Sequence, residues 1–250
     1  MKFIQEVIAN HKILRIEFDE LVDADFLNGI RWQAESKARN VHIGDAAGRE
    51  RNLEERESQN FLGTLADAIC YRLLKAFFKR HLSEVLVTRY DNVRTDDFKL
   101  HDEYDLKLNY GLNEYFIEVR SSVCNKMPVK SMIEKWQILG PYISDTKGNS
   151  EVDKHFYFRP IFHLKAFREN ISKGTYTRTR AKERVSKGEL ILYFVGGATA
   201  SLLAEKGRDD KGEELLQGAT SYRVLNILDG LDSESLLLTI KDTLVKNKLK

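Results

Sequence analysis

Asp105, Glu118 and Arg120 are the residues whose types and spacing best suit chemistry, because two acids and a base fall on what the sequence predicts to be neighbouring strands. Residues 104–109 and 114–123 each alternate between polar and apolar side chains, and they flank the turn sequence Tyr-Gly-Leu-Asn. This pattern is typical of an antiparallel hairpin. With the turn residues as the loop, directly opposed residues have numbers that sum to 223, so Asp105 faces Glu118.

One face of this predicted hairpin carries two acids and two bases: Asp105, Lys107, Glu118 and Arg120. Opposed Cβ atoms lie about 5 Å apart, so two like charges destabilise the pair unless something compensates. A divalent cation would compensate, since Mg²⁺ binds carboxylate and water oxygens and leaves positions for a phosphate oxygen and a water. On spacing alone, the commoner alternative is a solvated strand face on which these acids pair with nearby bases.

Asp105, an interval of twelve residues and the tripeptide Glu118-Val119-Arg120 within an apolar strand resemble the core of the PD-(D/E)XK nuclease superfamily. In that family, which has the restriction-endonuclease-like fold, the aspartate and the tripeptide lie on antiparallel neighbours. The resemblance implies that Asp105, Glu118 and the carbonyl of Val119 bind Mg²⁺, with Mn²⁺ as a substitute. It covers roughly residues 54–139.

A helix before the hairpin often supplies a further acid in this family, in a Gly-x-x-Gly/Ala-Glu pattern. Residues 60–67 (NFLGTLAD) resemble that pattern, with Asp67 in place of glutamate. Apolar side chains recur at helical spacing from about residue 54 to 82, so this segment is expected to be a long helix. Glu57 on the same helix is the alternative acid. The resemblance implies that the helix acid orients a water or a second metal.

Arg120 stands where the family usually has lysine. A lysine can lose its proton and help to deprotonate water, whereas arginine stays protonated and can only orient the water or stabilise phosphate charge. The resemblance implies a Mg²⁺-dependent endonuclease that hydrolyses DNA phosphodiester bonds and leaves a 5′-phosphate. A type II restriction enzyme, acting on double-stranded DNA as a homodimer, is the expected setting.

A basic segment, residues 165–187, holds eight Lys and Arg against two Glu, a charge of +6, which leaves −4 for the rest of the chain. Lysine and arginine supply much of the affinity for nucleic-acid phosphates. We therefore expect DNA-contacting elements within about residues 155–195. The named candidates are Lys173, Tyr176, Arg178, Arg180, Lys182 and Arg184. The alternative is a solvated surface, which charge runs usually are.

The aromatic run at residues 155–164 (HFYFRPIFHL) is better explained by core packing than by base stacking, because alternating aromatics suit a buried strand. Gly196-Gly197 lacks the other residues of a phosphate-binding loop and predicts a turn that ends a strand. The six histidines show no spacing that indicates zinc.

The expected fold is α/β (α+β), with a restriction-endonuclease-like mixed central sheet flanked by helices. We predict a single domain over residues 1–250, since no linker or repeat divides the chain. Strands besides the hairpin are expected at residues 13–18, 84–89, 155–164, 189–195 and 221–228. Helices are expected over much of residues 1–50 and at 54–82, 128–139, 199–206 and 233–246.

Composition excludes several classes of protein. The hydrophobic fraction of 42% and only three prolines exclude disordered and collagen-like chains. No apolar run approaches the ~20 residues of a membrane span, so no membrane partner is expected. Cys70 and Cys124 have no paired spacing, which favours buried thiols and a reducing cytoplasm.

Two other functions stay open from the sequence. A nuclease-like DNA-binding protein that has lost catalysis would explain Arg120 in the lysine position. An α+β protein unrelated to nucleic acid would show no DNA affinity even at low salt.

Overall fold

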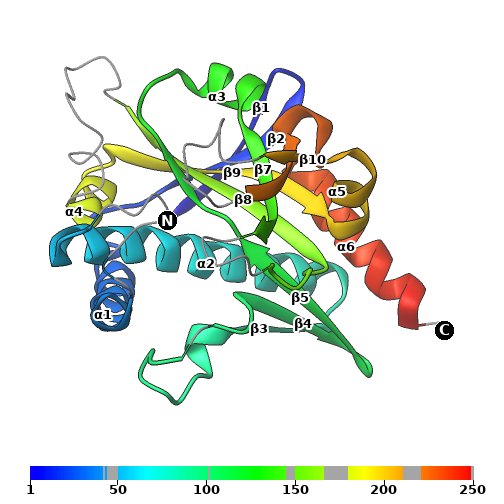
Figure 1. Ribbon diagram of the computed structural model, residues 1–250, viewed down its shortest axis with the longest axis horizontal. Coiled ribbons are helices and arrows are strands. Elements are labelled where there is room, and N and C mark those ends of the chain that lie inside the picture. The colour runs from blue at the N-terminus through cyan, green and yellow to red at the C-terminus, as the bar shows by residue number, and fades with distance from the viewer. Residues whose placement is uncertain are drawn as a thin grey trace.

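The computed structural model describes residues 1–41, 43, 50–100, 102–144, 150–165, 180–210 and 221–248. Within them the chain forms six α-helices and eleven strands, arranged as a mixed central sheet flanked by helices (Figure 1). The predicted α/β class is confirmed. None of the helices in the described residues is long and apolar enough to span a membrane.

The central sheet has eight strands in the order β1-β2-β9-β8-β5-β4-β3, with β6 beside β8. Among the described strands, only the β5–β8 and β6–β8 pairs are parallel, so the sheet is mixed. Its strands are β1 (Lys2–Ile8), β2 (His11–Glu17), β3 (Leu86–Arg89), β4 (Leu106–Tyr110), β5 (Asn113–Val119), β6 (Ser122–Cys124), β8 (Phe156–Leu164) and β9 (Leu190–Thr199).

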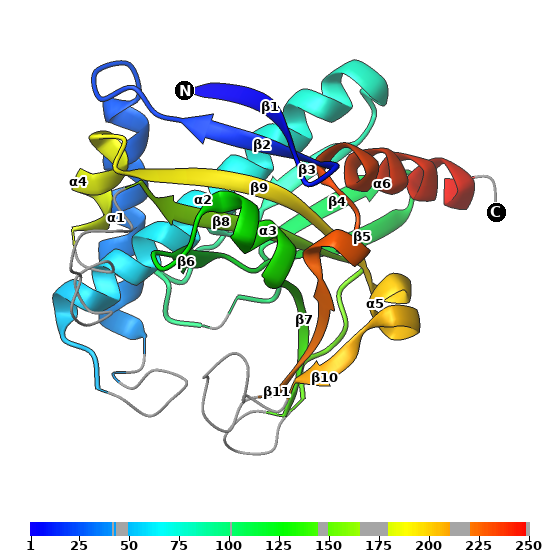
Figure 2. The ribbon, with the colours of Figure 1, turned by 90° about the horizontal axis from the view of Figure 1, so that it is seen from above.

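Helices cover both faces of this sheet (Figures 1 and 2). One face packs on α1 (Ala24–Asn40), α2 (Leu53–His81), α4 (Ala181–Ser186) and α6 (Ser233–Lys248). The other packs on α3 (Val129–Lys135), α5 (Ala200–Lys206) and a three-stranded sheet of β7 (Gln137–Ser144), β10 (Arg208–Asp210) and β11 (Ser221–Asn226). Two short 3₁₀ turns, η1 (Tyr90–Asn92) and η2 (Ile227–Asp229), complete the described elements.

The central strands are apolar on both faces because both faces are covered. In β8, Phe156, Phe158 and Phe162 face the core under α2, whereas Tyr157 and Ile161 face the second core under α3 and the small sheet. Every residue of β8 is buried. The prediction that this aromatic run packs in the core is confirmed.

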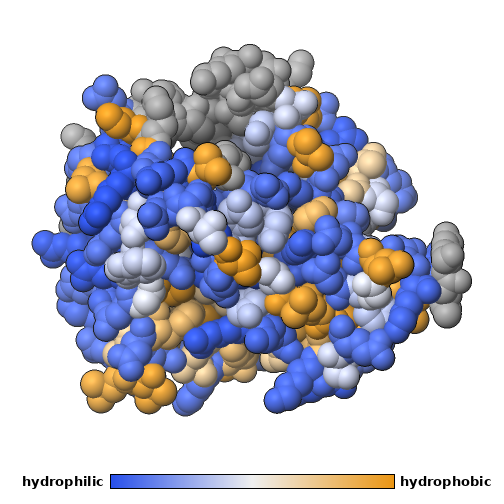
Figure 3. All heavy atoms as spheres, turned by 90° about the horizontal axis from the view of Figure 1, so that it is seen from below, coloured by the Kyte–Doolittle hydropathy of each residue, from blue (hydrophilic) through white to orange (hydrophobic). Residues whose placement is uncertain are grey.

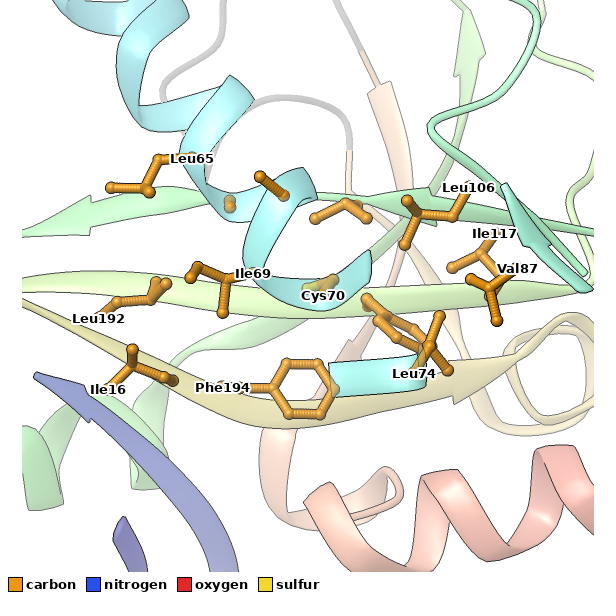
Figure 4. Packing of buried hydrophobic residues seen from close by; sticks show 14 of the residues in the cluster. Ile16, Leu65, Ile69, Cys70, Leu74, Val87, Leu106, Ile117, Leu192 and Phe194 are labelled. Atoms are coloured by element: carbon orange, nitrogen blue, oxygen red, sulfur yellow. The ribbon is translucent and has the colours of Figure 1, made fainter. Parts of the chain in front are cut away.

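Helix α2 is fixed by its cap and by its apolar face. Asn52 forms a capping box with Glu55, which satisfies backbone N–H groups at the start of the helix. Leu65, Ile69 and Leu74 point from α2 toward the sheet (Figure 4). Each buried leucine or isoleucine contributes about 1.5–3 kcal/mol to the free energy of folding, so this packing holds the helix against the sheet. It also places Asp67, which lies between Leu65 and Ile69, in the interior.

The outer surface seen from below is largely hydrophilic, with hydrophobic side chains in small separate groups (Figure 3). On this side, the described residues therefore form no single broad hydrophobic area. Cys70 and Cys124 are both buried and unpaired, as predicted.

Two predicted helical regions contain strands. Residues 2–8 were expected to be helical but pair with β2 as an edge strand, whose half-exposed residues give a weak periodic signal. The helix expected over residues 128–139 ends at Lys135, and β7 begins two residues later. Its partner β11 is distant in sequence, so local periodicity does not reveal the pairing.

Gly196 and Gly197 lie inside β9 rather than in a turn that ends it, so that prediction is wrong. The reason is a close backbone crossing. Gly197 exchanges two hydrogen bonds of 2.9 Å with Leu231, and a Cβ on Gly197 would lie 2.0 Å from the carbonyl oxygen of Tyr157. Glycine is required here because any side chain would push two chain segments apart.

Gly197→Ala is therefore expected to lower the free energy of unfolding by about 2–3 kcal/mol through overpacking. The matched control is Gly29→Ala on the exposed side of α1, where nothing lies within 4 Å of the new methyl group. That change should raise stability by about 0.5–1 kcal/mol. Chemical denaturation measures both, and equal effects of the two substitutions would contradict the crossing.

Candidate active site

The hairpin register predicted from the sequence is confirmed. Strands β4 and β5 pair from Leu106–Ile117 to Tyr110–Asn113, and each pair of residue numbers sums to 223. The connecting loop is Gly111-Leu112 alone, because the residues on either side of it also pair. Gly111 has a φ of +62°, a conformation that such tight hairpin loops need.

Asp105 lies one residue beyond the ladder, which ends at the Leu106–Ile117 pair, so strand pairing does not join it to Glu118. On the side of β3, the Asp105 carbonyl oxygen accepts a hydrogen bond from the Tyr90 amide (3.1 Å). Its carboxylate Oδ2 accepts one from the Val119 amide (2.7 Å). The aspartate is therefore anchored at the carboxyl end of β5, next to Glu118, by a contact that strand pairing alone does not predict.

Glu118 is largely withdrawn from water, with a side chain that is 15% exposed. Burial, together with the charge of Asp105, raises its pKa from 4.5 to about 8. Arg120 acts in the opposite direction, with Nη2 at 3.3 Å from Glu118 Oε1. A solvated strand face would leave this carboxylate in water, so that alternative does not describe Glu118.

Asp67 lies in the buried middle of α2 and is 8% exposed. Burial and the charge of Asp105 raise its pKa well above the usual value. The charges of Lys37 and Arg89 act in the opposite direction, but within the described residues the carboxylate forms no hydrogen bond and no ion pair within 4 Å. Glu57 lies about 15 Å earlier along the helix axis and lines a separate cavity of about 420 Å³ between α1, α2 and α4. Of the two helix acids, Asp67 is the one whose charge interacts with that of Asp105.

Lys37, on α1, was not singled out by the sequence. Its Nζ lies 2.9 Å from Asp91 Oδ1 and 3.1 Å from Asp102 Oδ2, and its side chain is 14% exposed. Burial alone lowers the pKa of Lys37, but the charges of Asp67, Asp91 and Asp102 raise it above its usual value. The one sequence signal for such a base was the high density of acidic residues between residues 91 and 105, because clustered acids need basic residues nearby.

Arg120 occupies the break between β5 and β6, where its backbone amide donates to the Phe158 carbonyl (2.9 Å). Its Nη2 forms ion pairs with Glu118 and Glu151. Its Nε is buried and has no hydrogen-bond partner in the described part of the chain. The ring of Tyr222, from β11, lies 5.9 Å from the guanidinium. Arg120 is therefore held by two acids through one nitrogen, and its buried Nε is a donor without a partner among the described residues.

The donor set suits a hard divalent cation. Asp105, Val119 and Glu118 come together at the end of β5, and the raised pKa values of Asp67, Asp105 and Glu118 reflect carboxylates crowded in a volume that excludes water. A cation there would relieve that crowding. Among the described residues, no three or more His, Cys, Asp or Glu side chains surround one point. Two carboxylates, a carbonyl and waters would suit Mg²⁺ rather than zinc.

The basic segment is only partly described. Lys173, Tyr176 and Arg178 lie outside the described residues. Arg180 is exposed at the start of α4, whereas Lys182 Nζ donates to Asn28 Oδ1 (2.5 Å). Arg184 lies mostly buried near Glu189.

The described residues 180–187 of this basic segment do not lie beside Asp105 and Glu118. Helix α4 packs on α1, α2 and β9, at the opposite end of α2 from β4 and β5 (Figure 1).

No family model, no curated protein and no solved structure matches the chain.

The raised pKa of Glu118 predicts a pH-dependent stability. A carboxyl group that keeps its proton in the folded state, but loses it when unfolded, destabilises the fold as pH rises. In EDTA, the free energy of unfolding should therefore fall between about pH 5 and pH 8. Glu118→Gln should reduce this fall by at least about 1 kcal/mol.

Denaturation at a series of pH values measures the effect. Glu205→Gln, at an exposed position on α5, is the control and should keep the wild-type slope. A Glu118→Gln protein with that same slope would show that Glu118 ionises in the fold as it does in water.

Proposed function

We propose that the chain is a Mg²⁺-dependent endonuclease that hydrolyses DNA phosphodiester bonds. The observation that carries the proposal is the hydrogen bond from the Val119 amide to Asp105, which brings two desolvated carboxylates and Arg120 together at the end of one strand. The sequence resemblance to the PD-(D/E)XK superfamily supplies the reaction class, and the register of the hairpin supports that resemblance.

Asp105, Glu118 and the Val119 carbonyl would hold the cation. When bound, Mg²⁺ lowers the pKa of water and offsets negative charge on the phosphate. Arg120, whose guanidinium lies beside Glu118, stabilises charge that develops on the phosphate oxygens. Asp67, which has no hydrogen-bonding partner among the described residues, orients the attacking water.

Water attacks in line and the product carries a 5′-phosphate. The proposed setting is a type II restriction enzyme in the cytoplasm, with double-stranded DNA as substrate. A two-fold homodimer would place one site on each strand. The exposed Arg180 at the start of α4 supports phosphate contacts away from the site.

Asp105→Asn tests the site directly. The amide keeps the size of the side chain but removes the charge that holds the cation. Mg²⁺-dependent cleavage of mixed-sequence plasmid DNA should therefore fall by at least about 100-fold, since losing only a partner of a metal ligand costs about 10–100-fold. Gel analysis and sequencing of product ends measure cleavage. Asp242→Asn, on the exposed side of α6, is the control and should cut like the wild type. Undiminished cleavage by Asp105→Asn would remove this site from the proposal.

The second candidate is a nuclease-like DNA-binding protein without catalysis. Arg120 favours it, because arginine cannot serve as a base at neutral pH. Such a protein would bind DNA in a salt-sensitive way and give no products with Mg²⁺ or Mn²⁺.

Arg120→Lys separates the two candidates. In an active enzyme, lysine keeps the positive charge and adds a group that can exchange its proton, so cleavage should be preserved or raised. The same plasmid assay with Mg²⁺ and with Mn²⁺ measures it, beside a filter-binding titration with salt. DNA binding without cleavage by either protein would favour the binding module.

A further inference from the structure

One nitrogen of Arg120 is shared between two carboxylates. Nη2 donates a hydrogen bond to Oε2 of Glu151, whereas Oε1 of Glu118 lies 3.3 Å away and forms an ion pair only. Glu151 precedes β8 and is far from the hairpin in sequence, so no motif indicates it. The position of Arg120 is therefore set by an acid outside the strand pair that carries the candidate ligands.

Glu151 is itself held in place by hydrogen bonds to the three-stranded sheet. Its amide donates to the Tyr142 carbonyl (3.0 Å), and its Oε2 accepts from the Tyr142 amide (3.1 Å), so β7 fixes both its backbone and its carboxylate. Its side chain is 12% exposed. The rings of Tyr142 and Tyr222 pack edge to face at 6.4 Å, and Tyr222 also lies beside the guanidinium. Glu151 can therefore hold Arg120 in one place.

This arrangement determines how readily Glu118 can bind a cation. A guanidinium that pairs fully with Glu118 competes with a cation for the same oxygens, and the two positive charges repel each other. A guanidinium drawn toward Glu151 keeps only a looser ion pair with Glu118, at 3.3 Å, so a cation can compete for the oxygens of Glu118.

We infer that Glu151 is a positioning residue that draws Arg120 away from Glu118 and so keeps Glu118 available to the divalent cation. The inference rests on the proposed function, and it adds a residue to which neither the sequence motif nor the resemblance assigns a role.

A double-mutant cycle on cation binding tests it without any cleavage assay. Calorimetric titration of the full-length protein with Mn²⁺ gives the affinity for the wild type, Glu151→Gln, Arg120→Gln and the double variant. Glu151→Gln should weaken Mn²⁺ binding about tenfold, the scale expected when a partner of a metal ligand is lost. In the Arg120→Gln background, the same change should alter the affinity by less than about twofold.

Loss of one negative charge could weaken cation binding by itself, and the cycle separates this effect. A general charge effect weakens binding equally in both backgrounds, and that result would overturn the inference. Asp153→Asn, at an exposed position on the same segment, is the matched charge control and should leave Mn²⁺ binding unchanged. Unweakened binding by a folded Glu151→Gln protein would also overturn the inference.

Thermal unfolding checks that the variants are folded. If Glu151→Gln does not fold, Glu151→Asp takes its place, because it keeps the charge but shortens the side chain and so loosens its hold on Nη2. It should bind Mn²⁺ more weakly than the wild type, and wild-type affinity would contradict the role.

Failure of the proposed function gives a different result. Wild-type protein that binds no Mn²⁺, or binds it equally well after Asp105→Asn, removes the metal site and the inference with it. Binding that is lost with Asp105→Asn but shows no coupling between Arg120 and Glu151 removes the inference alone.

Discussion

The crowding of buried carboxyl groups is the constraint on which the centre of this protein depends. Asp67, Asp105 and Glu118 are brought together where water is largely excluded, and burial raises the pKa of each carboxyl group. Basic side chains from segments far apart in the sequence lie near these carboxyl groups, because a buried carboxylate without a cation destabilises the fold. The charge of Lys37, from α1, acts on Asp67 and Asp105, and Arg120, from the break after β5, forms an ion pair with Glu118. The site is thus formed by helices and strands that are far apart in the sequence.

The fold supplies the rigidity that such a site requires. Helix α2 is held by a capping box and by apolar contacts with the sheet on the same face as the apolar side chains of β4 and β5. The central strands are buried on both sides, so they cannot slide without breaking two cores. Asp67 and the end of β5 are consequently fixed relative to each other by packing, and the polar contacts operate within that frame.

The sequence predicted what is local and periodic. The strict alternation in residues 104–123 determines the β4–β5 register, and helical spacing over residues 54–82 places Asp67 on a long buried helix. Lys37, Glu151 and Tyr222 escaped prediction because their roles depend on tertiary contacts between segments far apart in the chain. The strands β1 and β7 were missed for a related reason: one is a half-exposed edge, and the other pairs with a distant strand. The end of the β4–β5 ladder at Leu106 could not be predicted either, because the alternation of polar and apolar residues determines the register of a strand pair but not where the pairing stops.

The anchor of Asp105 is a main-chain amide, and this affects which substitutions the site can accept during evolution. Every amino acid except proline supplies that N–H group, so the identity of residue 119 does not matter to the anchor. The Val119 side chain instead packs in the core beneath α2, where only apolar residues of similar size fit. The middle residue of the tripeptide is therefore free to drift among aliphatic side chains, whereas its neighbours on either side carry charges that have specific partners.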